Sequence, residues 1–203
     1  EERRVAPGLI TYNAVASACE KGQQWELALG LLREMRSHQV SPDVITFNVM
    51  IAACARRQEW AQALLQLEEL QRSGLQPNAV SYNTAIYSFF GGCSPWLLAL
   101  RLHADMRRRK LAPDMITYTA LLSVCAGSGA WRQALSLLRE MGHLQLRPNV
   151  ITYSHAAGAA AQGLQGHALL SMAAELREGG QASLLMLCRP AVVHPPRSGP
   201  VRR

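Results

Sequence analysis

Hydrophobic side chains follow a helical spacing along the chain, and two kinds of segment alternate. In residues 24–37, apolar side chains recur at the i, i+3, i+4 and i+7 positions of one helix face, from Trp25 to Met35. Residues 11–19 before them are small or apolar, which suits close packing between helices. Thr11 stands at a capping position, and Gly22 marks the expected end of that first helix. The pattern predicts a pair of packed helices.

This helix pair recurs along the chain at a nearly constant interval. Each unit opens with an apolar residue, Thr or Ser, an aromatic residue and a short polar residue. The five copies of this signature begin at Ile10, Ile45, Val80, Ile116 and Ile151. Their aromatic residues, at positions 12, 47, 82, 118 and 153, are separated by 35, 35, 36 and 35 residues. Such a period predicts a stacked array of similar units and not one closed globule.

Tryptophan and cysteine residues also recur with this period, and their positions favour packing over chemistry. Each tryptophan is followed three residues later by Ala, which fits interhelical packing better than base stacking. The tryptophans are Trp25, Trp60, Trp96 and Trp131. Three cysteines, Cys19, Cys54 and Cys125, occupy one position of the repeat, and no Cys-x-x-Cys pair exists to hold zinc. We interpret them as core residues, with Cys93 and Cys188 as ordinary free thiols, and predict no metal site and no cofactor.

A short turn with its own signature joins the units. Each turn carries Pro followed by Asp or Asn just before the next unit, and proline stops the preceding helix. The pairs are Pro42-Asp43, Pro77-Asn78, Pro113-Asp114 and Pro148-Asn149, with Pro7-Gly8 as a degenerate counterpart. The extra residue of the third unit falls in the connection at 91–95, where Ser94 is expected to cap the next helix and Pro95 to open it.

Charge adds little to this picture. The chain has 21 Lys and Arg against 14 Asp and Glu, a net charge of +7 that favours a polyanionic partner. Four of these cations lie in the last fifteen residues, and without them 17 basic residues face 14 acidic ones. The basic run 107–110 is interpreted as a solvated helix end on the convex side. No apolar run reaches the roughly 18 to 20 residues of a membrane span.

A pair of short polar positions carries the functional signal. One member lies just inside each first helix, where Asn, Thr and Ser are mediocre helix formers. These residues are Asn13, Asn48, Asn83, Thr119 and Ser154. The other member is the Asp or Asn of the turn, which also has an ordinary explanation as a turn or capping residue. If the first helices line the concave side, each unit presents one pair of hydrogen-bonding side chains, enough to read one base.

These motifs resemble those of the pentatricopeptide repeat proteins, specifically arrays made purely of 35-residue units. The resemblance rests on the Thr-Tyr-Asn opening, the Ala-Leu and Glu-Met of the second helix, as in residues 28–29 and 34–35, and the Pro-Asp ending. It covers residues 9–149, with a decaying fifth unit beyond. The implied fold is all-α, a right-handed α-solenoid of helix-turn-helix repeats. Repeats are expected at 9–43, 44–78, 79–114 and 115–149, after the end of a preceding or truncated repeat at 1–8.

What the resemblance implies is binding of single-stranded RNA, one nucleotide per repeat, with the RNA running 5′ to 3′ as the protein runs from N to C. Carried over, Asn13 with Asp43 favours U, Asn48 with Asn78 a pyrimidine (C before U), Asn83 with Asp114 U, and Thr119 with Asn149 A. The expected core is 5′-U-(C/U)-U-A-3′. Ser154 would suggest a purine, but its unit lacks the Pro-Asp or Pro-Asn ending.

Two further sets of residues receive roles from the same resemblance. The apolar residue that opens each signature is expected to sandwich a base between consecutive units, although packing at the helix start explains it equally well. This set is Ile10, Ile45, Val80, Ile116 and Ile151. Lys21 and Arg56 lie at equivalent ends of first helices and are candidates for phosphate contacts, whereas later units have Gly91, Gly127 and Gln162 near there.

The remaining expectations concern the chain as a whole. Residues 150–184 are expected to form a degenerate repeat or cap, and the basic, Pro-rich residues 185–203 a disordered tail. The start close to Pro7 suggests a fragment or a very short member.

Deaminase motifs of the His-x-Glu and Pro-Cys-x-x-Cys type do not occur, so we predict no enzymatic activity. Organellar RNA processing, stability, splicing or translation, in chloroplast or mitochondrion, follows from the resemblance alone. The alternative is a protein-binding scaffold without RNA specificity.

Overall fold

The computed structural model of the chain describes residues 7–91 and 95–163, which form nine α-helices and no strand. The first helices of the units are α1 (Leu9–Lys21), α3 (Val44–Arg56), α5 (Ala79–Tyr87), α7 (Met115–Ser128) and α9 (Val150–Gln162). The second helices are α2 (Trp25–Ser37), α4 (Trp60–Arg72), α6 (Trp96–Arg108) and α8 (Trp131–His143). The predicted all-α helical-repeat solenoid is confirmed. The expected tail at 185–203 and most of the fifth unit lie outside the described residues.

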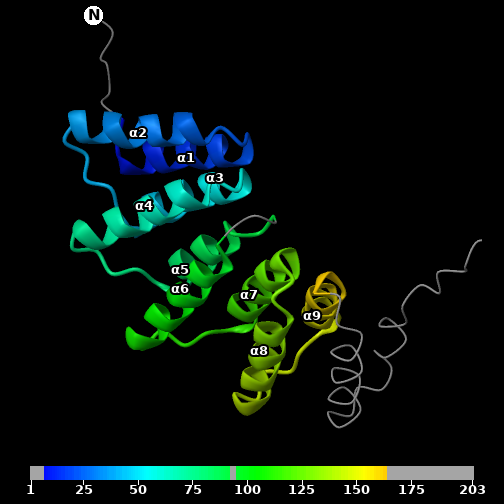
Figure 1. Cartoon of the computed structure of the whole chain (residues 1–203). Helices are drawn as coiled ribbons and strands as arrows, with labels where there is room; N and C mark the ends of the chain where they lie inside the picture. The colour runs from blue at the N-terminus through cyan, green and yellow to red at the C-terminus, as the bar shows by residue number, and fades with distance from the viewer. Residues whose placement is uncertain (1–6, 92–94, 164–203) are drawn as a thin grey trace, which may run out of the picture.

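The helices form two layers, one of first helices and one of second helices, and both extend along the whole array (Figure 1). Each first helix packs against the first helix of the next unit, so α1, α3, α5, α7 and α9 make a continuous inner layer. Each second helix packs against the first helices on either side of it, whereas backbone contacts between neighbouring second helices are few. Because the first helices approach one another more closely, their layer lies on the concave side of the array.

The core lies between the layers and is built from the repeated aromatic and small residues. Tyr82, Tyr118 and Phe47 are fully buried, and Ala at the second-helix position 28 and its equivalents is buried as well. The tryptophans are only half-buried and pack at the edge of this core, where Trp60 stacks on Phe89 with 5.7 Å between ring centroids. They contribute to packing between helices, as the sequence predicts, although their side chains are not fully enclosed.

The three repeated cysteines agree in part with their interpretation as core residues. Cys54 and Cys125 are buried, and burial raises the pKa of each thiol to about 12. Cys19, in the first unit, is half-buried. Within the described ranges, no group of three His, Cys, Asp or Glu side chains is placed to hold a metal ion, and no helix there has the length and apolar character to cross a membrane. Cys93 and Cys188 lie outside the described residues.

The helix starts differ from the sequence prediction in a way that matters for the site. Thr does not occupy the capping position: the N-cap of α3, α5, α7 and α9 is the Asp or Asn of the preceding turn, and Thr or Ser is the third helical residue. α1 starts after Gly8, with no side-chain cap. Likewise Pro95 is the N-cap of α6 and not its first residue, because its ψ of 82° is not helical, and Ser94 lies outside the described residues.

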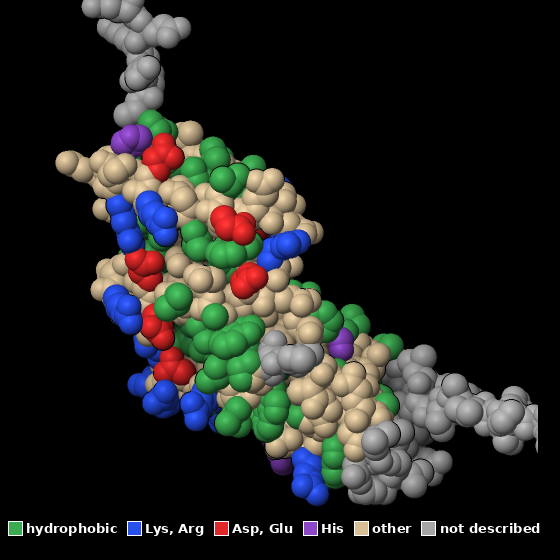
Figure 2. Space-filling view, turned by 45° about the horizontal axis from the view of Figure 1, so that its top comes forward, with side chains coloured by type: hydrophobic (Ala, Val, Ile, Leu, Met, Phe, Trp, Pro, Cys, Tyr) green, Lys and Arg blue, Asp and Glu red, His purple; other side chains and the backbone are tan. Residues whose placement is uncertain are grey.

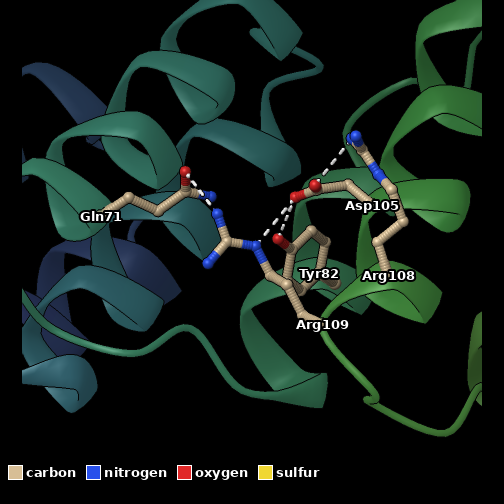
Figure 3. A network of polar contacts seen from close by, with 5 residues as sticks. All are labelled: Gln71, Tyr82, Asp105, Arg108 and Arg109. Atoms are coloured by element: carbon tan, nitrogen blue, oxygen red, sulfur yellow. Dashed lines mark hydrogen bonds and ion pairs between the residues drawn. The ribbon is translucent and has the colours of Figure 1, made fainter.

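Two basic side chains at the end of α6 contact neighbouring units, so the run 107–110 is not merely a solvated helix end. Arg107 pairs with Glu140 of the next second helix, as Arg36 does with Glu69. Arg109 contacts Asp105 at 3.1 Å and reaches Gln71 of the preceding unit at 3.1 Å (Figure 3). Asp105 also accepts from the Tyr82 hydroxyl of α5. Figure 2 shows basic and acidic side chains interleaved along the edge where the second helices end. Arg107 and Arg109 therefore help to join repeats, whereas Arg108 pairs with Asp105 within α6.

Candidate nucleic-acid interface

The polar pairs form where one first helix meets the next. Asp43 is counted as the last residue of the first unit, but it caps α3 of the second unit. Because α1 packs against α3, Asn13 on α1 lies beside it, and its Nδ2 donates to Asp43 Oδ1 at 3.5 Å. The same arrangement joins Asn48 to Asn78 at 3.4 Å and Asn83 to Asp114 at 3.2 Å. The structure thus brings together three of the four predicted pairs.

A hydroxyl that sequence reasoning did not single out holds each of these pairs. In the first pair, the Thr46 hydroxyl lies 2.7 Å from Asn13 Oδ1 and 2.8 Å from Asp43 Oδ1. It also accepts from the Asp43 backbone N–H, which completes a capping box. Ser81 and Thr117 make the same contacts in the next two units. Each of these hydroxyls is fully buried, and the signal in the sequence is the invariable Thr or Ser of every unit.

This arrangement fixes which atoms remain for a ligand. A hydroxyl carries one proton, and the carboxylate already accepts the Thr46 backbone N–H at 2.8 Å. The Asn13 amide is therefore oriented, with its oxygen toward the hydroxyl and its nitrogen toward the carboxylate. All these bonds use Oδ1 of Asp43, so Oδ2 and the second amide hydrogen of Asn13 are the groups that a ligand would meet.

The carboxylates of the pairs stay ionised. Partial burial alone would raise the pKa of Asp43, but the hydrogen bonds from the Thr46 N–H and hydroxyl and from Asn13 outweigh it and hold the pKa below its usual value. Burial and the bonds from Thr117 and Asn83 have the same net effect on the pKa of Asp114. Both side chains therefore act only as hydrogen-bond acceptors near neutral pH.

The fourth pair differs from the other three. The Thr119 hydroxyl donates to the Met115 carbonyl at 2.6 Å, and the Thr152 hydroxyl donates to the Asn149 carbonyl. Asn149 Oδ1 accepts the Thr152 backbone N–H at 3.0 Å, so the cap itself is retained. Thr119 and Asn149 are not hydrogen-bonded to each other, but they line one hollow of about 550 Å³ between α5 and α7. Ser154 of the fifth unit is exposed on α9.

A row of exposed aliphatic side chains runs beside the pairs. The exposed fraction is 85% for Ile10 and between 56% and 66% for its four counterparts, which are Ile45, Val80, Ile116 and Ile151. These side chains do not pack into the core, so helix-start packing does not explain them. They follow the polar pairs at the same interval along the inner layer, and they offer apolar surface to a ligand.

The two candidate phosphate contacts have different surroundings. Lys21 is the last residue of α1 and is exposed. Arg56, at the equivalent position of α3, donates from Nε to Glu20 at 2.7 Å, and its side chain is 50% exposed. The acidic partner offsets part of the Arg56 charge, so Arg56 is a weaker attractor for an anion than its position alone suggests.

Comparison with known proteins agrees with the repeat pattern. A model of the PPR repeat family matches residues 7–56 and 42–91, and a pentatricopeptide repeat domain model matches residues 101–160. A search of curated proteins finds no match.

Solved structures show the same architecture. The pentatricopeptide repeat protein PPR10 from maize is 30% identical, with a TM-score of 0.71 over 90% of this chain and 27% of its own. PPR10 in complex with an 18-nt psaJ RNA element is 26% identical, with a TM-score of 0.67 over 92% of this chain and 29% of its own.

The PPR domain of Arabidopsis thaliana protein-only RNase P 1, solved in complex with tRNA, is 18% identical with a TM-score of 0.62, over 74% of this chain and 79% of that one, and shows the fold alone. The chain spans less than a third of the PPR10 chains. Matching family models over more than half of its length, the chain belongs to the pentatricopeptide repeat family.

Proposed function

We propose that this chain binds single-stranded RNA along the layer of first helices and reads one base per repeat. The observation that carries the proposal is the set of inter-unit polar pairs, each held in one orientation beside an exposed aliphatic side chain. The likeness to PPR10, which has been solved with an 18-nt RNA element, supports it. The proposed core is 5′-U-(C/U)-U-A-3′, with Asn13 and Asp43 at the first place.

The aliphatic row supplies the stacking surfaces. A base at the first place would lie between Ile10 and Ile45, and its flat faces would remove both side chains from water. Such burial is favourable by about 25 cal/mol for each Å² of apolar surface and does not depend on base identity. Affinity therefore comes largely from the row, and selectivity from the pair at the edge of the base.

The Asp-containing pairs suit uracil. Asp43 Oδ2 is an acceptor only, and it would meet the N3–H of uracil, while the remaining amide hydrogen of Asn13 would donate to a uracil carbonyl. Cytosine has an unprotonated N3 at that place, and its lone pair would face the carboxylate. The same reasoning applies to Asn83 with Asp114 at the third place.

The Asn-containing pairs present the opposite group. Asn78 Oδ1 accepts the Ser81 backbone N–H at 3.0 Å, so its amide nitrogen is left as a donor. A donor suits the unprotonated N3 of cytosine, which puts C before U at the second place. Asn149 is oriented in the same way by Thr152, and its donor suits N1 of adenine. Thr119 is shorter than Asn and leaves room for the larger purine.

We assign the chain a binding role, with processing, stability, splicing or translation of an organellar RNA carried out with protein partners. The placement in chloroplast or mitochondrion follows the family. Electrostatic attraction is expected to be modest, because Lys21 is exposed and Arg56 is shared with Glu20. Since each phosphate contact on a single strand contributes about −0.7 to the slope of log affinity against log salt, a slope between roughly −1 and −2 is expected.

Fluorescence anisotropy with short labelled RNAs tests the proposal. RNA containing U-C-U-A is compared with RNA carrying purines at the first three places, at low salt and along a salt series. We expect the purine RNA to bind at least about tenfold more weakly, since each well-matched base edge contributes about 1–3 kcal/mol of discrimination. Equal affinity for both RNAs would contradict base reading, and absence of binding to either by this chain and by an array extended with further repeats would favour a protein scaffold.

Two matched variants test whether base preference depends on the inner layer of first helices. Asn48→Ala removes one amide from a polar pair, and we expect it to reduce the preference for a pyrimidine at the second place to about twofold or less. Gln71→Ala removes an amide of similar size from the outer network. It should leave base preference unchanged, and a similar loss in both variants would argue against the assigned surface.

A further inference from the structure

Two aromatic side chains of the third unit stand exposed beside the polar pairs. Tyr87 and Phe90 are 49% and 38% exposed, and their rings stack with centroids 5.9 Å apart and planes inclined by 9°. Tyr87 is one helical turn beyond Asn83 on α5, so both lie on the same helix face. We call Tyr87 and Phe90 the aromatic wall.

This wall belongs to the third unit alone. The residues equivalent to Tyr87 in the other units are Ser17, Ala52, Ser123 and Gly158, and those equivalent to Phe90 are Glu20, Ala55, Ala126 and Ala161. The repeated architecture therefore does not require aromatic residues here. Their rings are exposed and not used in the core, which indicates a role on the surface.

The wall separates two hollows. On one side lies the hollow of about 550 Å³ that also contains Asn83, Ile116, Thr119 and Asn149. On the other side lies a hollow of about 470 Å³ that contains Arg56. The larger one joins an aromatic face to hydrogen-bonding groups, within the roughly 300–1,000 Å³ range of small-ligand pockets. An aromatic ring beside oriented amides suits a flat heterocycle with polar edges.

The third unit also lacks the cation of the first two. Gly91 stands at the position of Lys21 and Arg56, and its φ of 123° lies in a region that L side chains rarely adopt. A Cβ there would come 2.4 Å from Oε1 of Gln58. The positive φ therefore disfavours a basic side chain in this turn, and the wall offers apolar stacking where the third unit has no cation equivalent to Lys21 and Arg56.

We propose that the aromatic wall is a stacking platform for an RNA base, and that the purine at the fourth place lies in the larger hollow between the wall and Ile116, with the wall taking the place that Ile151 would otherwise have. This inference rests on the proposed RNA-binding function and adds a contact beyond the one-pair-per-repeat scheme. His155 lines the same hollow, and burial lowers its pKa, so the ring is neutral near pH 7 and leaves the site without a charge that would favour phosphate over base. Stacking on an aromatic ring tolerates any base, and the polar groups around Thr119 then select the purine.

The test uses RNA in which 2-aminopurine replaces the adenine of U-C-U-A. Its fluorescence falls when it stacks, so binding to the unaltered chain should quench it. We expect Tyr87→Ala and Phe90→Ala to weaken binding about tenfold and to restore most of the fluorescence at saturation. Tyr87→Phe keeps the ring and should behave like the unaltered chain. Leu27→Ala removes an exposed apolar side chain from the second-helix layer and should change neither readout.

The outcomes separate this inference from the function on which it rests. If U-C-U-A RNA binds with the expected base preference but both alanine variants keep full quenching and affinity, the platform is overturned while RNA binding stands. If neither the unaltered chain nor an array extended with further repeats binds RNA at low salt, both proposals fail. Thermal unfolding of the variants provides the control for folding. Because Tyr87 and Phe90 are exposed, replacing either side chain should leave the transition temperature nearly unchanged.

Discussion

His103 occupies a position that the other second helices fill with Leu. Leu32, Leu67 and Leu138 are its equivalents, and its ring is 6% exposed. Its Nε2 is buried without a hydrogen-bond partner, and its ring meets Tyr118 edge to face at 5.6 Å between centroids. Burial lowers the pKa of His103, opposed by the charge of Glu140 and aided by that of Arg107. The residue is thus a polar exception in an apolar row.

We predict that His103→Leu stabilises the protein, by about 1–3 kcal/mol at pH 7.5, because an unsatisfied buried nitrogen is replaced by a side chain that suits the site. The gain should grow on acidification. Below about pH 6.5 the unfolded chain binds a proton on this His and the folded chain does not, so the free energy of unfolding falls as pH drops. Urea denaturation at pH 7.5 and 5.5 measures both effects.

The reciprocal change is the control for this prediction. Leu67→His places the same ring at the equivalent position of α4 and should introduce the acid sensitivity that His103→Leu removes. Identical stability of His103→Leu and the unaltered chain at both pH values would show that the buried ring carries no cost.

At the scale of elements, the first helices combine a structural task with a binding one. The residue that caps each of α3, α5 and α7 is the acceptor half of the polar pair from the preceding unit, so the cap and the pair share one side chain. The buried hydroxyl three residues later holds both. A capping interaction contributes about 1 kcal/mol, which gives each pair a stable support without any ligand.

We predict that Thr117→Val, which keeps the shape of the side chain but removes its hydroxyl, lowers the free energy of unfolding by about 1 kcal/mol and reduces the preference for U at the third place. The reason is that Asn83 Oδ1 loses its donor at 2.6 Å and its amide becomes free to turn. Calorimetry and anisotropy with third-place base changes measure the two effects.

Thr152→Val is the matched control, because its hydroxyl bonds only the Asn149 carbonyl and holds no Asn of an inner pair. It should alter stability by a similar amount and leave the third place unchanged. Loss of third-place preference in both variants would indicate a general effect of weakened helix starts.

The sequence predicts most of these elements because the repeat itself encodes them. Period, aromatic spacing and the Pro-Asp turn suffice for the helix pairs, the solenoid and the positions of the polar pairs. The hydroxyl of Thr46 was missed as a pair holder because its contacts form only when α1 packs on α3. Tyr87 and Phe90 were missed for the opposite reason: they do not repeat, and periodic reasoning ignores what one unit has alone.

At the scale of the whole molecule, the solenoid places its sites in a line. The first helices follow one another in sequence order from α1 to α9 (Figure 1), so the polar pairs at their contacts lie in the same order. Because each unit contacts only its neighbours, a change in one pair has no direct route to a distant pair. We therefore expect the repeats to read bases independently of one another and in a fixed order.

The most direct measurement is the base preference of Asn83→Thr at all four places of the RNA. Thr leaves more room beside Asp114, whose carboxylate still requires an N–H on the base, and guanine supplies that N–H on a larger ring. We predict that the base preference at the third place moves from U to G by about tenfold or more, while the first, second and fourth places keep their preferences. Unchanged preference at the third place, or a change spread over all four, would contradict it.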